Sequence, residues 1–129
     1  MKGRYRFVTA SGYERDVGIV RKDFQMAKVV GNVRYGKSFI FYRSVMKWIY
    51  VDYEDIVWVY RRPEDVQMKF GNETEEPEVH SLMIVTKDKK RIGMPVGDSD
   101  AAVEGLKIIR KHNTFADVGF TKEKEERYL

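Results

Sequence analysis

Apolar residues gather most densely between Ser38 and Arg62, where three strand-like runs follow one another within 25 residues. The runs are rich in aromatic and β-branched side chains and are separated by segments of turn length, which join antiparallel neighbours. Both sets of alternating positions are apolar, so we expect a sheet that is covered on both faces. The expected strands are Ser38–Arg43, Lys47–Asp52 and Ile56–Arg62, with a shorter strand, Val33–Tyr35, before them.

Within these strands an aromatic side chain commonly alternates with an aliphatic one, which places the two kinds on opposite faces. We expect the aliphatic set to fill the inside of a curved sheet: Ile40, Ile49, Val51, Val57 and Val59. The aromatic set then forms the outer face: Phe39, Phe41, Trp48, Tyr50, Trp58 and Tyr60.

The expected aromatic face is the candidate binding surface of this sequence. An aromatic face with arginines can stack single-stranded nucleic acid or anchor a protein partner. Two alternatives are that a helix of the same chain covers it, or that it mediates self-association. The candidate partner-binding residues are Arg43, Trp48, Tyr50, Trp58, Tyr60 and Arg62.

The segment before these strands has helical spacing, and a short strand over Tyr5–Thr9 precedes it. Ser11 stands three residues before Glu14, the spacing of a capping box. A helix is expected from about Gly12 to Val30, ended by the Gly31-Asn32 pair, although two strands remain the alternative. The apolar stripe of this helix is Val17, Val20, Phe24 and Ala27.

The second half of the chain predicts a further hairpin and a second helix. Val66–Phe70 predicts a weaker strand, and Gly71–Glu78 an acidic loop. The hairpin is formed by Val79–Thr86 and Lys90–Pro95. A helix from about Asp100 to His112 follows, with an apolar stripe that includes Leu106 and Ile109. Phe115 and Phe120 are expected to fold back onto the body, and Thr121–Leu129 to form a short charged helix or a frayed end.

Several antiparallel strands followed by one helix resemble a pleckstrin-homology-like (PH-like) domain of the kind found in uncharacterised bacterial proteins. Three segments carry the resemblance: YEDIVWVYRR at 53–62, SLMIVTKDKKRIGMP at 81–95, and AAVEGLKIIRKHNTFADVGFT from residue 101. The resemblance implies an α+β fold, an antiparallel half-barrel of six or seven strands closed by the C-terminal helix. Phosphoinositide binding does not follow, because only Lys37 and Arg43 match the basic motif of the first hairpin.

The length of 129 residues is typical of one domain. We divide it into an N-terminal addition over 1–32, a PH-like core over 33–120 and a charged tail over 121–129. The chain has no cysteine, and we expect it to work in the cytoplasm. Residues 1–62 carry 13 Lys and Arg against 6 Asp and Glu. This excess of positive charge permits an anionic partner, but it bears on association and not on the fold.

Candidate chemistry is sparse. His80 and His112 have no partner at metal-ligand spacing, and they are interpreted as a surface strand residue and a helix-end residue. Asp52, Glu54 and Asp55 are best explained as a turn. We therefore expect no catalytic residue, no metal and no cofactor. The sequence favours a non-enzymatic interaction or scaffold module that binds a protein partner or itself. The alternative is a binder of nucleic acid or anionic surfaces.

Overall fold

The computed structural model describes residues 6–66 and 79–129 of the chain. Its described part is a mixed α+β structure with two sheets, so the predicted α+β class is confirmed. The first sheet has the strand order β1-β5-β4-β3-β2, with β1 (Phe7–Thr9), β2 (Lys28–Val30), β3 (Val33–Tyr35), β4 (Phe39–Ser44) and β5 (Lys47–Asp52). The second has the order β8-β7-β6-β9, with β6 (Ile56–Arg61), β7 (His80–Thr86), β8 (Arg91–Gly97) and β9 (Asp117–Val118).

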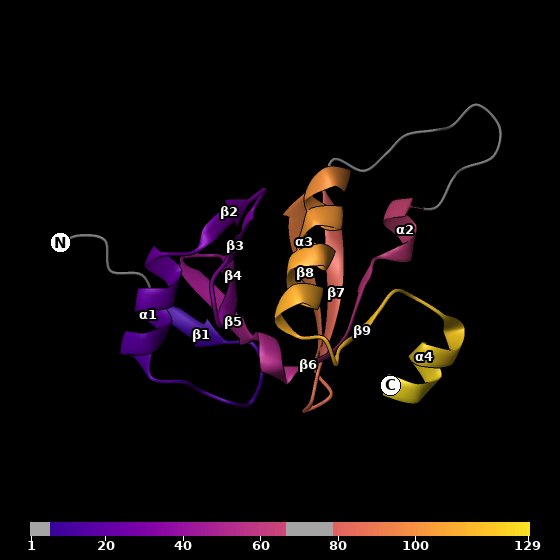
Figure 1. Cartoon of the computed structure of the whole chain (residues 1–129), viewed down its shortest axis with the longest axis horizontal. Coiled ribbons are helices and arrows are strands. Elements are labelled where there is room, and N and C mark those ends of the chain that lie inside the picture. The colour runs from indigo at the N-terminus through magenta and orange to yellow at the C-terminus, as the bar shows by residue number, and fades with distance from the viewer. Residues whose placement is uncertain (1–5, 67–78) are drawn as a thin grey trace.

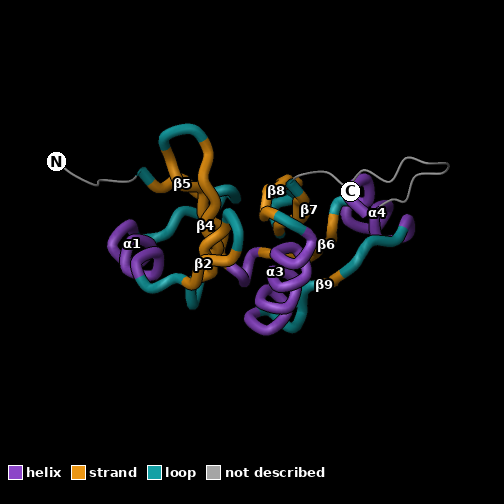
Figure 2. The backbone as a smooth tube through the Cα atoms, turned by 90° about the horizontal axis from the view of Figure 1, so that it is seen from above, coloured by secondary structure: helices purple, strands orange, loops and turns teal. Residues whose placement is uncertain are grey.

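The helices lie around these two sheets (Figure 1). They are α1 (Val17–Gln25), α2 (Pro63–Val66), α3 (Ser99–His112) and α4 (Lys122–Tyr128), and a single 3-10 turn, η1 (Tyr53–Asp55), joins β5 to β6. From left to right, Figure 1 shows α1, the first sheet, α3 with the second sheet, and α4. Figure 2 shows the same sequence of layers from above, with α1 and α4 at opposite ends.

The strands do not form one continuous half-barrel, and no closed barrel is present in the described residues. The division occurs at Tyr53–Asp55, where the sequence predicts a hairpin turn and the chain instead makes η1. The Asp52 carboxylate accepts a hydrogen bond from the backbone amide of Glu54 at 2.8 Å, and the side-chain amide of Asn113 donates to the carbonyl oxygens of Tyr53 and Ile56. These bonds hold β6 away from β5, so β6 begins a second sheet.

The N-terminal helix is shorter than predicted. It begins at Val17, because the Asp16 carboxylate accepts from the amides of Gly18 and Ile19; the Ser11–Glu14 capping box does not form. Residues 28–30 form β2 instead of the last helical turn. Val30 pairs with Val33, so the predicted helix stop at 31–32 is a two-residue hairpin turn.

Gly31 adopts a φ of 61° in that turn, and a Cβ there would lie 2.1 Å from the Val96 carbonyl oxygen. The next amide, that of Asn32, donates to the same oxygen at 3.0 Å. This contact joins the β2–β3 turn of the first sheet to β8 of the second. A glycine is required here by both conformation and space.

The main core lies between the two sheets, and α3 covers it on one side (Figure 1). The predicted burial of Ile109 is confirmed, and Leu106 packs against the same cluster. Gly105 brings the helix close to the first sheet, since a Cβ there would meet the Tyr35 hydroxyl at 2.3 Å. The inner faces of the sheets contribute Val33, Tyr35, Ile40, Val51, Val59, Leu82, Ile84, Met94 and Val96.

Each sheet also has an apolar outer face, and each outer face is covered by a helix. α1 places Val20 and Phe24 on the first sheet, against Phe39, Phe41, Trp48 and Tyr50. α4 places Tyr128 on the second sheet, against the cluster of Trp58, Tyr60 and Val85. The sequence therefore predicts correctly that the strands are covered on both faces, but two sheets and two helices achieve it.

Several smaller predictions have clear outcomes. The hairpin of β7 and β8 and the helix α3 are found where predicted, and the tail forms α4. Phe120 folds back, with its ring centroid 5.3 Å from that of Tyr60, whereas Phe115 is exposed. Val66 ends α2 rather than beginning a strand, and both the rest of that predicted strand and the acidic loop Gly71–Glu78 lie outside the described residues.

Candidate binding surfaces

The predicted aromatic face does not exist as one surface. Trp48 and Tyr50 lie on the outer face of the first sheet under α1, whereas Trp58 and Tyr60 lie on that of the second sheet near α4. All four side chains are buried. The residues are on the faces predicted for them within each strand, but the break at η1 places them on opposite sides of the molecule.

Val57 departs from the predicted alternation. The ladder between β6 and β7 shifts register between Ile56 and Trp58, so a bulge occurs at this point. Val57 consequently packs with Trp58 and Tyr60 rather than in the aliphatic core.

The two predicted arginines have different surroundings. The Arg62 guanidinium lies 3.0 Å from the carboxylate of buried Asp65, which also accepts from the Ser81 amide at 2.7 Å. Arg62 therefore supports the connection between β6 and β7. Arg43 is exposed, and its guanidinium lies 5.9 Å from the Trp48 ring centroid.

Arg34, which sequence reasoning missed, joins Arg43 on the outer face of the first sheet. Its guanidinium lies 4.5 Å from the Phe24 ring centroid and 5.1 Å from that of Trp48. Val29 and Tyr42 help to line a shallow groove of about 410 Å³ beside these arginines. Arg34 lies between buried Val33 and Tyr35 in β3. Because side chains alternate along a strand, this position places Arg34 on the outer face.

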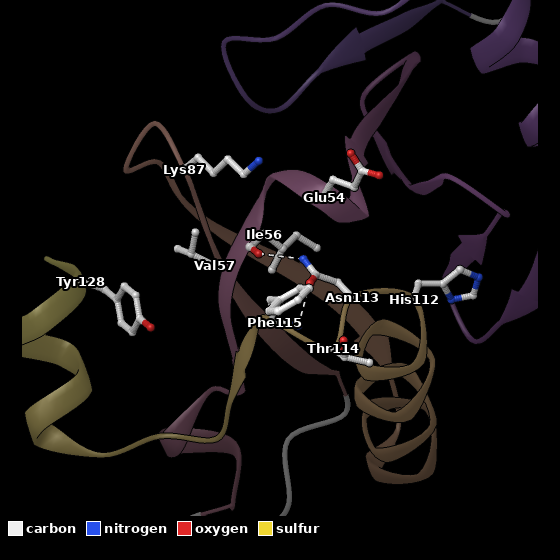
Figure 3. A pocket seen from close by; sticks show the side chains of 9 residues that line it. All are labelled: Glu54, Ile56, Val57, Lys87, His112, Asn113, Thr114, Phe115 and Tyr128. Atoms are coloured by element: carbon white, nitrogen blue, oxygen red, sulfur yellow. Dashed lines mark hydrogen bonds between the residues drawn. The ribbon is translucent and has the colours of Figure 1, made fainter.

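A groove with a volume of about 580 Å³ lies where α3 ends (Figure 3). Its lining comes from the start of β6, the loop after α3, and α4. Ile56, Val57 and Tyr128 provide apolar surface, while Glu54 and Lys87 provide opposite charges. We call it the Phe115 groove, because Phe115 also lines it.

Phe115 is 97% exposed, although a phenylalanine normally lies inside a fold. The loop that carries it is held in place. The side-chain amide nitrogen of Asn113 donates to the Tyr53 carbonyl oxygen at 2.7 Å and to the Ile56 carbonyl oxygen at 3.0 Å, and its side-chain oxygen accepts from the backbone amide of Phe115 at 3.0 Å. An aromatic ring is thus presented to solvent from a fixed backbone.

The two histidines differ from each other in burial. His112 is exposed, and its ring stacks on Tyr53 with a centroid distance of 4.2 Å. His80, predicted to lie on the surface, is buried at the start of β7. The Arg61 guanidinium lies 3.2 Å from the Nδ1 atom of His80 and donates to the Ser99 hydroxyl at 3.0 Å. The interpretation of His80 as a surface residue is therefore wrong.

The three acids of the 52–55 segment lie in η1 and at its N-cap, so they belong to the connection between β5 and β6, although this connection is not the predicted hairpin turn. Asp55 is buried and receives the Arg15 guanidinium at 3.1 Å, while Arg15 also lies 3.3 Å from Asp52. Burial raises the pKa of the Asp55 carboxyl, and the charge of Arg15 acts in the opposite direction. Among residues 6–66 and 79–129, no three His, Asp or Glu side chains are grouped as a metal site would require.

The family model for the domain of unknown function DUF6709 matches residues 13–128. The chain belongs to this family. A search of curated proteins found no match, and a search of solved structures found none either. The matched range begins before α1 and ends with α4, so it contains the Phe115 groove and both arginines of the first sheet. No helix in the described part of this DUF6709 member has the length and hydrophobicity to cross a membrane.

Proposed function

We propose that this DUF6709 domain is a non-enzymatic interaction module that docks another protein at the Phe115 groove. The observation that carries the proposal is the ring of Phe115, which is exposed to solvent at the edge of an apolar groove. Aromatic side chains are enriched among the residues that dominate protein interfaces, because their burial removes a large apolar area from water.

The backbone around Phe115 supports this role. Three hydrogen bonds of Asn113 fix the loop before any partner arrives, so little conformational entropy is lost on binding. Glu54 and Lys87 flank the apolar lining and add electrostatic selectivity. The complementary partner offers an apolar recess for the ring, with a basic and an acidic group beside it.

We further propose that the fold is PH-like. A series of antiparallel strands precedes one long helix, and that helix covers the core between two sheets, as α3 does here. PH-like domains are frequently used as docking platforms, which agrees with the proposed role. The absence of cysteine fits a reducing compartment, and we propose the cytoplasm as the place of action.

The proposal is tested with Phe115→Ser and a matched control, Val45→Ser, at another exposed apolar position. Proteins captured by the immobilised domain are identified, purified and titrated against each variant by calorimetry. We expect Phe115→Ser to weaken binding about tenfold or more and Val45→Ser to leave it unchanged. Equal binding by Phe115→Ser and wild type would contradict the proposal, as would reproducible catalytic turnover by the purified domain. Loss of a dimer on sedimentation of Phe115→Ser would identify a second copy as the partner.

A second candidate function is binding of single-stranded nucleic acid at the first sheet. It is favoured by Arg34 and Arg43, whose guanidinium groups lie beside Trp48 in the 410 Å³ groove. If it is correct, a fluorescent oligonucleotide binds with an affinity that falls steeply with salt concentration. Arg43→Gln then lowers the slope of log affinity against log salt concentration by about one. Lys122→Gln on α4 is the control, and equal effects of both changes would reject this site.

A further inference from the structure

A second pocket lies along the seam between α3 and the first sheet, and its volume is about 470 Å³. It is separate from the Phe115 groove, although His112 lines both. Met26 and Ile108 give it an apolar side. The size falls in the range of sites that hold small organic ligands.

Four lysines from three parts of the chain line this seam pocket. Lys28 comes from β2, Lys37 from the turn after β3, and Lys107 and Lys111 from the last turns of α3. The only acid in the lining is Glu104, which lies 3.8 Å from Lys28. The nearby Asp23 carboxylate is already occupied, since it accepts from the backbone amides of residues 37, 38 and 39. The lining therefore carries an excess of positive charge.

Tyr35 also lines the seam pocket, and its hydroxyl is buried behind that lining. Its side chain is 4% exposed, and its hydroxyl has no hydrogen-bond partner among the described residues. A buried hydroxyl left without a partner is unfavourable, and such groups in native structures commonly mark functional sites. Burial, with a further contribution from Glu104, raises the pKa of this phenol, so the hydroxyl keeps its proton.

We propose that the seam pocket binds a small organic phosphate. The ammonium groups of Lys37, Lys107 and Lys111 contact the phosphate, and the buried Tyr35 side chain closes the pocket on the side of the core. Phosphate is favoured over carboxylate because a phosphate monoester carries up to two negative charges against one for a carboxylate, and several lysines of the lining can meet them as point charges. Met26 and Ile108 receive the organic part of the ligand.

The test is a titration of the ¹⁵N-labelled full chain with phenyl phosphate, followed by the amide resonances of residues 35–37 and 104–111. We expect these resonances to shift with saturation. The Lys107→Gln/Lys111→Gln variant should bind about tenfold more weakly or worse, because two charge-assisted contacts are lost. The control is Lys89→Gln/Lys122→Gln, which removes the same charge from exposed positions outside the pocket and should leave the affinity unchanged.

Several outcomes would overturn the proposal. Equal weakening in both double variants would mean that binding depends on net charge and not on this pocket. Benzoate binding as tightly as phenyl phosphate would reject phosphate as the ligand class. Lysine-dependent cosedimentation with phosphatidylserine vesicles, without any phenyl phosphate shift, would assign the lysines to a membrane surface.

Discussion

Replacing Phe24 with alanine is expected to lower the free energy of unfolding by about 3–5 kcal/mol. Phe24 is the centre of the contact between α1 and the first sheet. Its ring makes edge-to-face contacts with those of Phe7, Phe41 and Trp48, at centroid distances of 5.1, 5.1 and 4.9 Å, and the Arg34 guanidinium lies 4.5 Å from it. The truncation therefore leaves a cavity lined by aromatic side chains that α1 cannot fill by small shifts.

The weakened contact between α1 and the first sheet should be visible in the fluorescence of Trp48, whose emission moves to longer wavelength as water reaches its ring. Chemical denaturation followed by fluorescence gives the stability, and hydrogen exchange should accelerate over residues 17–25 first. Ile19→Ala on the exposed side of the same helix is the control, expected to change stability by less than about 0.5 kcal/mol. A Phe24→Ala protein as stable as wild type would show that α1 is not a structural cover.

Replacing Trp58 with alanine is expected to have a comparable effect, about 3–5 kcal/mol, on the opposite side of the molecule. Trp58 is completely buried, and its indole N–H donates to the Gly119 carbonyl oxygen at 2.8 Å. Its ring also contacts those of Tyr60 and Tyr128, with centroids 4.3 and 5.3 Å away. The change removes both the apolar contact and the hydrogen bond that hold the C-terminal segment.

Hydrogen exchange distinguishes this loss from general destabilisation. In Trp58→Ala, amides of residues 117–128 should exchange faster before those of α1 do, which reverses the order expected for Phe24→Ala. Phe115→Ala serves as the aromatic control, since its exposed ring contributes little to stability. If the two large truncations accelerate exchange in the same segments, the two outer layers do not open independently.

The sequence predicts the individual strands well because their hydrophobic pattern is local. The strands β3 to β5, the β7–β8 hairpin and α3 all lie close to their predicted positions. The division into two sheets is different, since it depends on Asn113, which comes from beyond α3 and binds the turn between β5 and β6. A contact between residues so distant in the chain produces no periodic pattern in the sequence, so the division into two sheets cannot be predicted from it.

The candidate site shows the same limitation. The aromatic side chains are placed on the correct face of each strand, but the alternation does not reveal that β6 belongs to another sheet. The sequence predicts that Phe115 folds back onto the body, whereas the loop fixed by Asn113 holds its ring in solvent. The lysines of the seam pocket come from three separate parts of the chain, so no local motif announces them.

Near each end of the chain, a strand pairs in parallel with a strand from the middle of the sequence. This pairing affects the order in which the protein can fold. β1 pairs with β5, and β9 pairs with β6, so these two edge strands need the middle of the chain as their template. During synthesis β1 leaves the ribosome before its partner β5, which includes Trp48. The apolar residues of β1 and α1 therefore stay exposed until β5 has been synthesised. A nascent chain with such exposed apolar surface is prone to aggregate.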